Sequence, residues 1–107
     1  MFPFPDYRIA RASRRFFIHA AADVRSSLVP GIHVGVIRDI SEGGIFFYSD
    51  FKPSIGTRVR LSFVSPIENT RQHCEGIVVR VEHSRAGAAP GIALQLTDKN
   101  TALRFSA

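Results

Sequence analysis

Residues 58–63 read Arg58-Val59-Arg60-Leu61-Ser62-Phe63, a strict alternation of polar and apolar side chains. Successive side chains of a β-strand point to opposite faces, so this pattern predicts a strand with one face in a core and the other in solvent. Shorter or less regular patterns of the same kind recur on both sides of it. Five further strands are predicted, over about 15–24, 32–39, 45–48, 74–81 and 91–96, with turn residues between them.

Six short strands separated by turns favour an all-β fold, and closing the sheet removes the exposed edges that a small β-domain must avoid. We therefore expect a six-stranded antiparallel β-barrel over residues 15–107. A flexible basic arm over 1–14 should precede it, since Pro3 and Pro5 disfavour a helix there. Asp98 is a candidate N-cap for a short C-terminal helix over 100–105.

The composition is that of a folded domain, with 107 residues, 45% hydrophobic and 21% charged. No apolar run approaches the roughly 20 residues that a transmembrane helix needs, and the first residues lack the pattern of a secretory signal. Cys74 is the only cysteine, so no internal disulfide can form. We expect a cytoplasmic location, which includes that of a cytoplasmic domain in a larger membrane-associated protein.

The basic residues are unusual in kind. Of the 14 in the chain only Lys52 and Lys99 are lysines, so the other twelve are arginines. Arginine is favoured where planar, bidentate contacts to phosphate or to a guanine edge are needed. Four arginines lie within eight residues near the N-terminus: Arg8, Arg11, Arg14 and Arg15. The pattern favours a phosphate-bearing partner, although a solvated basic tail explains the same charges.

A second polar cluster lies in Asp39-Ile40-Ser41-Glu42-Gly43-Gly44, where a predicted strand ends. Asp39 and Ser41 are two residues apart, so their side chains point to the same side. The carboxylate can accept hydrogen bonds from the N1–H and N2–H₂ edge of a guanine, and the hydroxyl can donate to a phosphate oxygen. Gly44 permits a positive φ or the close approach of a ligand. Ordinary turn chemistry explains the same residue types.

Together the two clusters resemble the paired motifs of the PilZ domain family. Arg11 and Arg15 match its Arg-x-x-x-Arg motif, with Phe16 in the apolar position that follows. The second motif, Asp-x-Ser-x-x-Gly, is matched over 39–44, and Ile45 continues it into the next strand. The segments 74–80 and 91–96 resemble the family's fifth strand and its closing strand that begins with glycine. The resemblance covers about residues 8–105.

The resemblance implies a non-enzymatic receptor for cyclic di-GMP, with no cofactor and no metal. Arg11 and Arg15 would contact phosphate and the guanine O6 and N7 atoms, with Arg14 as a further phosphate contact. Asp39 and Ser41 would read a second guanine edge. Gly44 would keep the turn tight.

In this family the ligand is one molecule or an intercalated pair, and the sequence does not decide between them. Binding would order the arm and alter contacts with a downstream protein or a fused domain. The process controlled would be motility, exopolysaccharide export or transcription. A homodimer stays open, and no nucleic-acid partner is expected.

Two alternatives remain. A small barrel that binds single-stranded nucleic acid would use Phe46, Phe47 and Tyr48 as a stacking platform, although alternating core and surface aromatics explain that run as well. A degenerate PilZ-like module would act in protein interaction alone. Arg38 and Arg80 could line the same face as the motifs, but the sequence does not place them. The four histidines and the lone cysteine lack the spacing of a zinc site.

Overall fold

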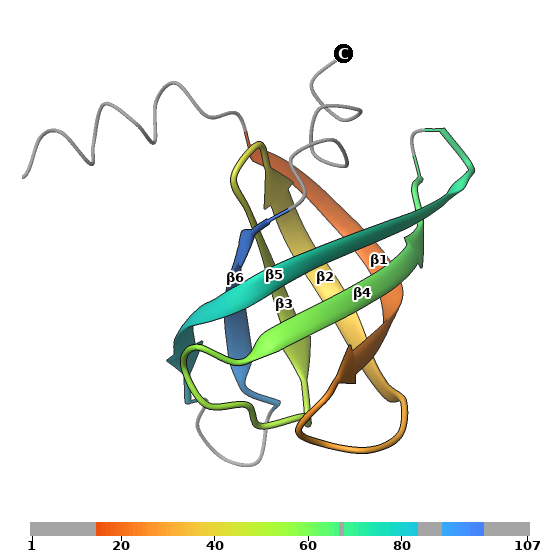
Figure 1. Ribbon diagram of the computed structural model, residues 1–107. Helices are drawn as coiled ribbons and strands as arrows, with labels where there is room; N and C mark the ends of the chain where they lie inside the picture. The colour runs from red at the N-terminus through yellow and green to blue at the C-terminus, as the bar shows by residue number, and fades with distance from the viewer. Residues whose placement is uncertain (1–14, 67, 84–88, 98–107) are drawn as a thin grey trace, which may run out of the picture.

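The computed structural model describes residues 15–66, 68–83 and 89–97. Six antiparallel strands close into a barrel (Figure 1). The strands are β1 (Arg15–Ser26), β2 (His33–Ser41), β3 (Gly44–Ser49), β4 (Arg58–Val64), β5 (Arg71–Glu82) and β6 (Gly91–Leu96). Around the barrel they follow the order β1-β2-β3-β6-β5-β4, and β4 pairs back onto β1. The six-stranded antiparallel barrel expected from the sequence is confirmed.

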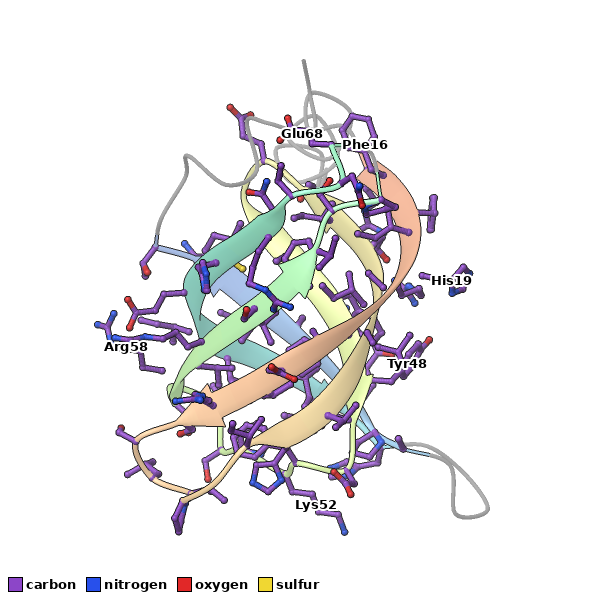
Figure 2. The ribbon with its side chains drawn as sticks, turned by 90° about the vertical axis from the view of Figure 1, so that its right-hand side faces the viewer. Phe16, His19, Tyr48, Lys52, Arg58 and Glu68 are labelled. Carbon is purple, nitrogen blue, oxygen red and sulfur yellow. The ribbon has the colours of Figure 1, made fainter. Side chains whose placement is uncertain are left out.

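Strand β4 has the faces that its alternation predicts. Val59, Leu61 and Phe63 point into the core and are at most 1% exposed. Arg58 and Arg60 are exposed on the outer surface. Burying an apolar side chain of this size stabilises the fold by about 1.5–3 kcal/mol. Figure 2 shows Arg58 and Tyr48 projecting from opposite sides of the barrel.

Strand β2 is apolar on both faces, and packing decides which one points inward. Gly35 and Ile37 face the core, whereas Val34 and Val36 are exposed. A Cβ on Gly35 would lie 3.1 Å from a ring carbon of Phe47. The glycine therefore leaves room for Phe47, whose side chain is fully buried in the core.

Irregularities in β2 and β5 change which side chains reach the outer surface. Ile37 and Ile40 are three residues apart and both fully buried, which the two-residue period of a regular strand does not allow. A register shift lies between Ile37 and Asp39, opposite β3. A second shift lies in β5 between Val78 and Arg80, opposite β6. Such bulges place two consecutive residues on one side of a strand.

The β5 bulge breaks the alternation of a regular strand. The two-residue period of the predicted strand over 74–81 places Ile77, Val79 and Val81 on one face, and this expectation is wrong. Val78 is fully buried, Val79 is 46% exposed and Val81 is partly buried against the core.

The expected arm over 1–14 and helix over 100–105 lie outside the described residues. Within the described part of the chain, no helix is long and apolar enough to cross a membrane.

Candidate functional site

The last residue of the first motif meets the second motif on the outer surface where β1 begins and β2 ends. Arg15 is the cross-strand partner of Ser41, and Phe17 is the partner of Asp39. Directly opposed residues on neighbouring strands project to the same face. Arg15 is exposed, and Phe17 is 70% exposed. The second of the predicted arginines therefore lies beside the Asp-x-Ser turn, whereas Arg11 and Arg14 lie outside the described residues.

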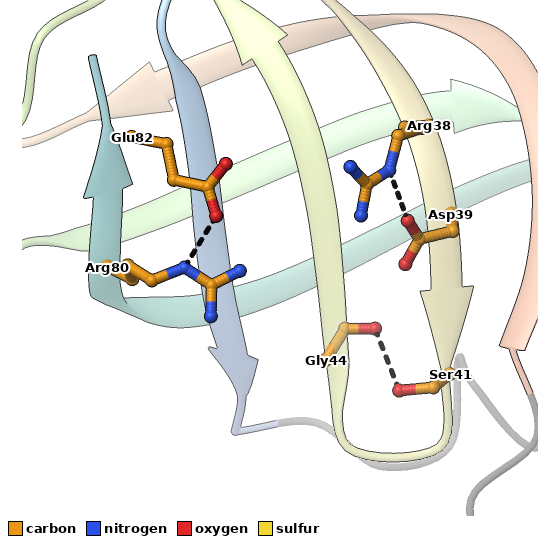
Figure 3. Close-up of polar contacts among 6 residues, drawn as sticks. All are labelled: Arg38, Asp39, Ser41, Gly44, Arg80 and Glu82. Atoms are coloured by element: carbon orange, nitrogen blue, oxygen red, sulfur yellow. Dashed lines mark hydrogen bonds and ion pairs between the residues drawn. The ribbon is translucent and has the colours of Figure 1, made fainter. Parts of the chain in front are cut away.

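The turn between β2 and β3 is stabilised by a hydrogen bond within the turn and by close packing against β6. The Ser41 hydroxyl donates to the Gly44 carbonyl at 3.4 Å (Figure 3). A Cβ on Gly44 would lie 2.8 Å from the carbonyl oxygen of Leu94 on β6. Gly44 is not among the positive-φ glycines of the described chain, so glycine is needed here because β6 approaches closely.

Asp39 is paired to its neighbour on the bulge. The Arg38 Nε donates to Asp39 Oδ2 at 2.6 Å, and the two side chains are 34% and 7% exposed respectively. The hydrogen bond that Arg38 donates to Asp39 holds the pKa of the Arg38 guanidinium above its ordinary value, with help from Tyr48 and against the effect of burial. Arg38 therefore stays charged, and one oxygen of the nearly buried carboxylate is already occupied.

Phe46 lies beneath this ion pair. It is the cross-strand partner of Asp39 and is only 4% exposed, although it belongs to the outer face. The Arg38 guanidinium carbon is 4.0 Å from the Phe46 ring centroid, a stacking distance for a cation on an aromatic face. The Tyr48 ring meets it edge-on at 5.3 Å. A Cβ on Gly91 would overlap the tip of the Phe46 ring, so the ring fits only beside a glycine.

Arg80 reaches the same ring from β5. Its guanidinium carbon is 5.9 Å from the Phe46 centroid, and its Nε is 2.9 Å from Glu82 Oε2 (Figure 3). Arg38 and Arg80, which the sequence could not locate, thus converge on Phe46. Arg38 lies within the β2 bulge, and Arg80 directly follows the extra residue of the β5 bulge. The signal in the sequence was the spacing of apolar residues by three, as in Ile37 and Ile40.

The aromatic run of β3 does not form the exposed platform considered above. Phe47 is fully buried in the core, Phe46 is covered by Arg38, and Tyr48 is 38% exposed. Only one of the three rings therefore offers a surface to a stacking base. The reading of the run as core and surface aromatics fits this arrangement.

The outer face of β1, β2, β3 and β5 therefore combines several kinds of polar group. Arg15, Arg38 and Arg80 carry guanidinium donors, Asp39 an acceptor and Ser41 a hydroxyl. Forked donors suit phosphate, and a carboxylate suits a base edge that presents N–H groups. In the described ranges, no three His, Cys, Asp or Glu side chains gather as metal ligands. The arrangement is suited to an anion that also carries a hydrogen-bonding base.

Comparison with known proteins gives the family. A model of the PilZ domain matches residues 9–105. Among solved structures, the chain is similar to the Bacillus subtilis inhibitor of motility MotI/DgrA, with a TM-score of 0.69 and 15% identity over 88% of this chain and 46% of that one. It is also similar to the PilZ domain of CeSA from a cellulose-synthesising bacterium, with a TM-score of 0.61 and 24% identity over 87% and 89% of the two chains.

No match is found among the curated proteins. At these identities the structural neighbours establish the fold, and this chain spans less than half the length of the motility inhibitor. The family rests on the sequence match, which covers nearly the whole chain. The chain therefore belongs to the PilZ domain family, a family of cyclic di-GMP receptors and thus of binding modules rather than enzymes.

Proposed function

We propose that this domain binds cyclic di-GMP where the start of β1 meets the turn between β2 and β3. The observation that carries the proposal is the pairing of Arg15 with Ser41 and of Phe17 with Asp39. It brings a cation, a hydroxyl and a carboxylate from two separate motifs onto one face. A cyclic dinucleotide needs all three, because it presents phosphates and guanine edges together.

The phosphates are the partners of the arginines. Arg15 is exposed at the edge of the face, so its guanidinium can form two parallel hydrogen bonds to a phosphate. Arg11 lies four residues before Arg15 in the sequence, and Arg14 adds a further cation between them. In the proposed complex Arg11 and Arg15 also donate to the O6 and N7 atoms of a guanine.

The guanine edge is the partner of Asp39 and Ser41. Its N1–H and N2–H₂ groups need two acceptors, yet Asp39 Oδ2 already accepts from Arg38 and the side chain is only 7% exposed. We therefore propose that Arg38 turns away from Asp39 when the ligand binds. The guanidinium that is released remains over Phe46, where its N–H groups face the ligand. Gly44 acts indirectly, by letting β3 and β6 approach and so holding Ser41 in place.

The signal is carried by the arm. We assign residues 1–14 to the arm and 15–107 to the barrel domain, and we propose that the ligand orders the arm against the barrel. A segment fixed by a ligand presents a new surface, which is a common form of molecular switch. The receiver is a downstream protein or a fused domain in the cytoplasm, where the second messenger is made available.

Isothermal titration calorimetry with cyclic di-GMP, cyclic di-AMP and GTP tests the proposal. Cyclic di-GMP should bind at micromolar concentration or below. Cyclic di-AMP should bind at least about tenfold more weakly, because adenine has an acceptor at N1 and no amino group at C2, and so lacks both donors that Asp39 would pair with. If cyclic di-GMP does not bind at micromolar concentration, the domain is a degenerate member that acts through protein contacts alone.

A further inference from the structure

The opposite wall of the barrel carries arginines that the cyclic di-GMP site does not use. Arg25 of β1 is the direct cross-strand partner of Arg60 of β4. Both are exposed, and Arg58 follows on the same face of β4. Like charges placed directly opposite each other on neighbouring strands destabilise a sheet. This arrangement therefore costs stability unless an anion lies between the two guanidinium groups.

Two acidic residues lie nearby, and neither forms an ion pair with Arg25 or Arg60. Asp23 of β1 lines an adjoining pocket with both arginines but takes part in none of the ion pairs of the described residues. Glu75 of β5 lies opposite Arg60 in register, but its carboxylate pairs with Arg58 at 3.6 Å. In the part of the chain that the structure describes, Arg25 and Arg60 take part in no ion pair. Two positive charges are left side by side.

These side chains surround a hollow of about 300 Å³, which is at the lower end of ligand-pocket sizes. It is lined by Arg25, Ser26, Ser27, Arg58, Arg60 and Glu75. The Ser26 Oγ accepts a hydrogen bond from the Leu28 N–H at 3.1 Å, so its own proton is free to be donated. The hollow thus offers hydroxyl donors beside two unneutralised guanidinium groups.

The chemistry of the hollow favours a phosphate group over a carboxylate. A phosphate monoester carries nearly two negative charges at neutral pH, which matches the two unneutralised arginines. Its three terminal oxygens can accept from two guanidinium forks and a hydroxyl together. A carboxylate would leave one of the positive charges unbalanced.

The hollow is separate from the site proposed above. In the strand order, β4 lies across the barrel from β3, which carries Phe46 and Tyr48. Figure 2 shows Arg58 and Tyr48 on opposite sides of the molecule. A ligand held by Asp39 therefore cannot be the anion at Arg25 and Arg60.

We propose that this hollow is a second, independent site, which binds the phosphate group of a phosphate monoester. The monoester is carried by a nucleotide or by a phosphorylated side chain of another protein. The inference does not rest on cyclic di-GMP binding, because it uses none of the residues of that site.

Titration with inorganic phosphate at pH 8 and constant ionic strength tests the proposal. Saturable binding is expected for the wild-type chain, and acetate should not compete. The double variant Arg25→Gln, Arg60→Gln should bind phosphate at least about tenfold more weakly, because it loses two charge-assisted contacts. Both side chains are exposed, so the variant should fold, and circular dichroism checks this.

A control variant separates this site from the rest of the chain. Lys52→Gln removes an exposed cation outside the hollow and should bind phosphate like the wild type. The proposal is overturned if phosphate does not saturate, if acetate competes equally, or if the double variant binds as tightly as the wild type. Phosphoserine and a nucleoside monophosphate are titrated in parallel. The one that binds more tightly identifies the kind of molecule that carries the phosphate.

Discussion

Arg38 joins the two halves of the binding face, because one guanidinium group both pairs with Asp39 at 2.6 Å and stacks on Phe46 at 4.0 Å. The Asp39 carboxylate, which we expect to bind the guanine edge, is therefore neither solvent-exposed nor unpaired. It is held by a cation, which the ligand displaces in the complex proposed above. In that complex the affinity would depend on the difference between two partners of Asp39 rather than on the new contacts alone.

Replacing Arg38 by Met should lower the free energy of unfolding by about 1–3 kcal/mol. The methionine still covers Phe46, but the nearly buried carboxylate of Asp39 loses its charged partner. Urea denaturation followed by circular dichroism measures the change.

Arg80→Met is the matched control for that variant. Arg80 also lies over Phe46, but both members of its pair with Glu82 are more than half exposed. Exposed pairs contribute about 0–1 kcal/mol, so little stability should be lost. Equal losses in the two variants would show that packing on Phe46, and not the ion pair with Asp39, supplies the stability.

The adjacent glycines of the β2–β3 turn should respond differently to alanine. Gly44→Ala should destabilise the barrel by about 1–3 kcal/mol, because a Cβ 2.8 Å from the Leu94 carbonyl forces β3 and β6 apart. Gly43→Ala should be nearly neutral, since a Cβ there would meet no atom within 4 Å. Thermal denaturation of the two variants provides the comparison, and a loss at Gly43 as large as at Gly44 would contradict it.

Much of the fold could be predicted because most strands repeat with a period of two. The alternation of residues 58–63 assigns every side chain of that segment to a face, and the structure agrees. The meeting of Arg15 with Ser41 also follows from the chain, because consecutive antiparallel strands bring the start of one beside the end of the next. The face of β2 that points inward was not predictable. It is decided by the packing of the Phe47 ring against Gly35, and this contact exists only in the closed barrel.

The contacts around Phe46 could not be predicted from local pattern. Each depends on an extra residue in a strand, which moves Arg38 and Arg80 onto one face from strands far apart in sequence. Gly91 begins β6 as expected, and it also leaves room for the tip of the Phe46 ring. The apolar spacing of three at Ile37 and Ile40 indicates a bulge, but the register between strands decides which residues then meet, and the sequence of one strand does not determine that register.

Asp39→Ala should weaken cyclic di-GMP binding by a factor on the order of ten to a hundred, because the guanine N1–H and N2–H₂ groups lose their acceptor. Calorimetric titration gives the dissociation constants. Asp23→Ala removes an exposed carboxylate outside this site and should have little effect. If the domain instead bound single-stranded nucleic acid through its cations, Asp39→Ala would leave binding unchanged, and the affinity would fall steeply with salt.

Arg15→Ala and Arg11→Ala should each reduce the affinity for cyclic di-GMP by roughly tenfold or more, since each removes a charge-assisted, bidentate contact. Neither change should lower the melting temperature, because Arg15 is exposed and no core residue depends on it. Titration calorimetry and thermal denaturation on the same preparations separate binding from folding.

Lys52→Ala controls for the loss of one positive charge. Lys52 is exposed in the β3–β4 connection, away from the β2–β3 turn. If long-range attraction alone draws the ligand, Lys52→Ala and Arg15→Ala should weaken binding to a similar small extent. In 0.5 M salt both variants should then bind like the wild type, because the screening length is only about 4 Å. If Arg15 makes the direct contact proposed here, its variant stays weaker than Lys52→Ala at high salt, because a hydrogen-bonded pair is screened far less than a distant one.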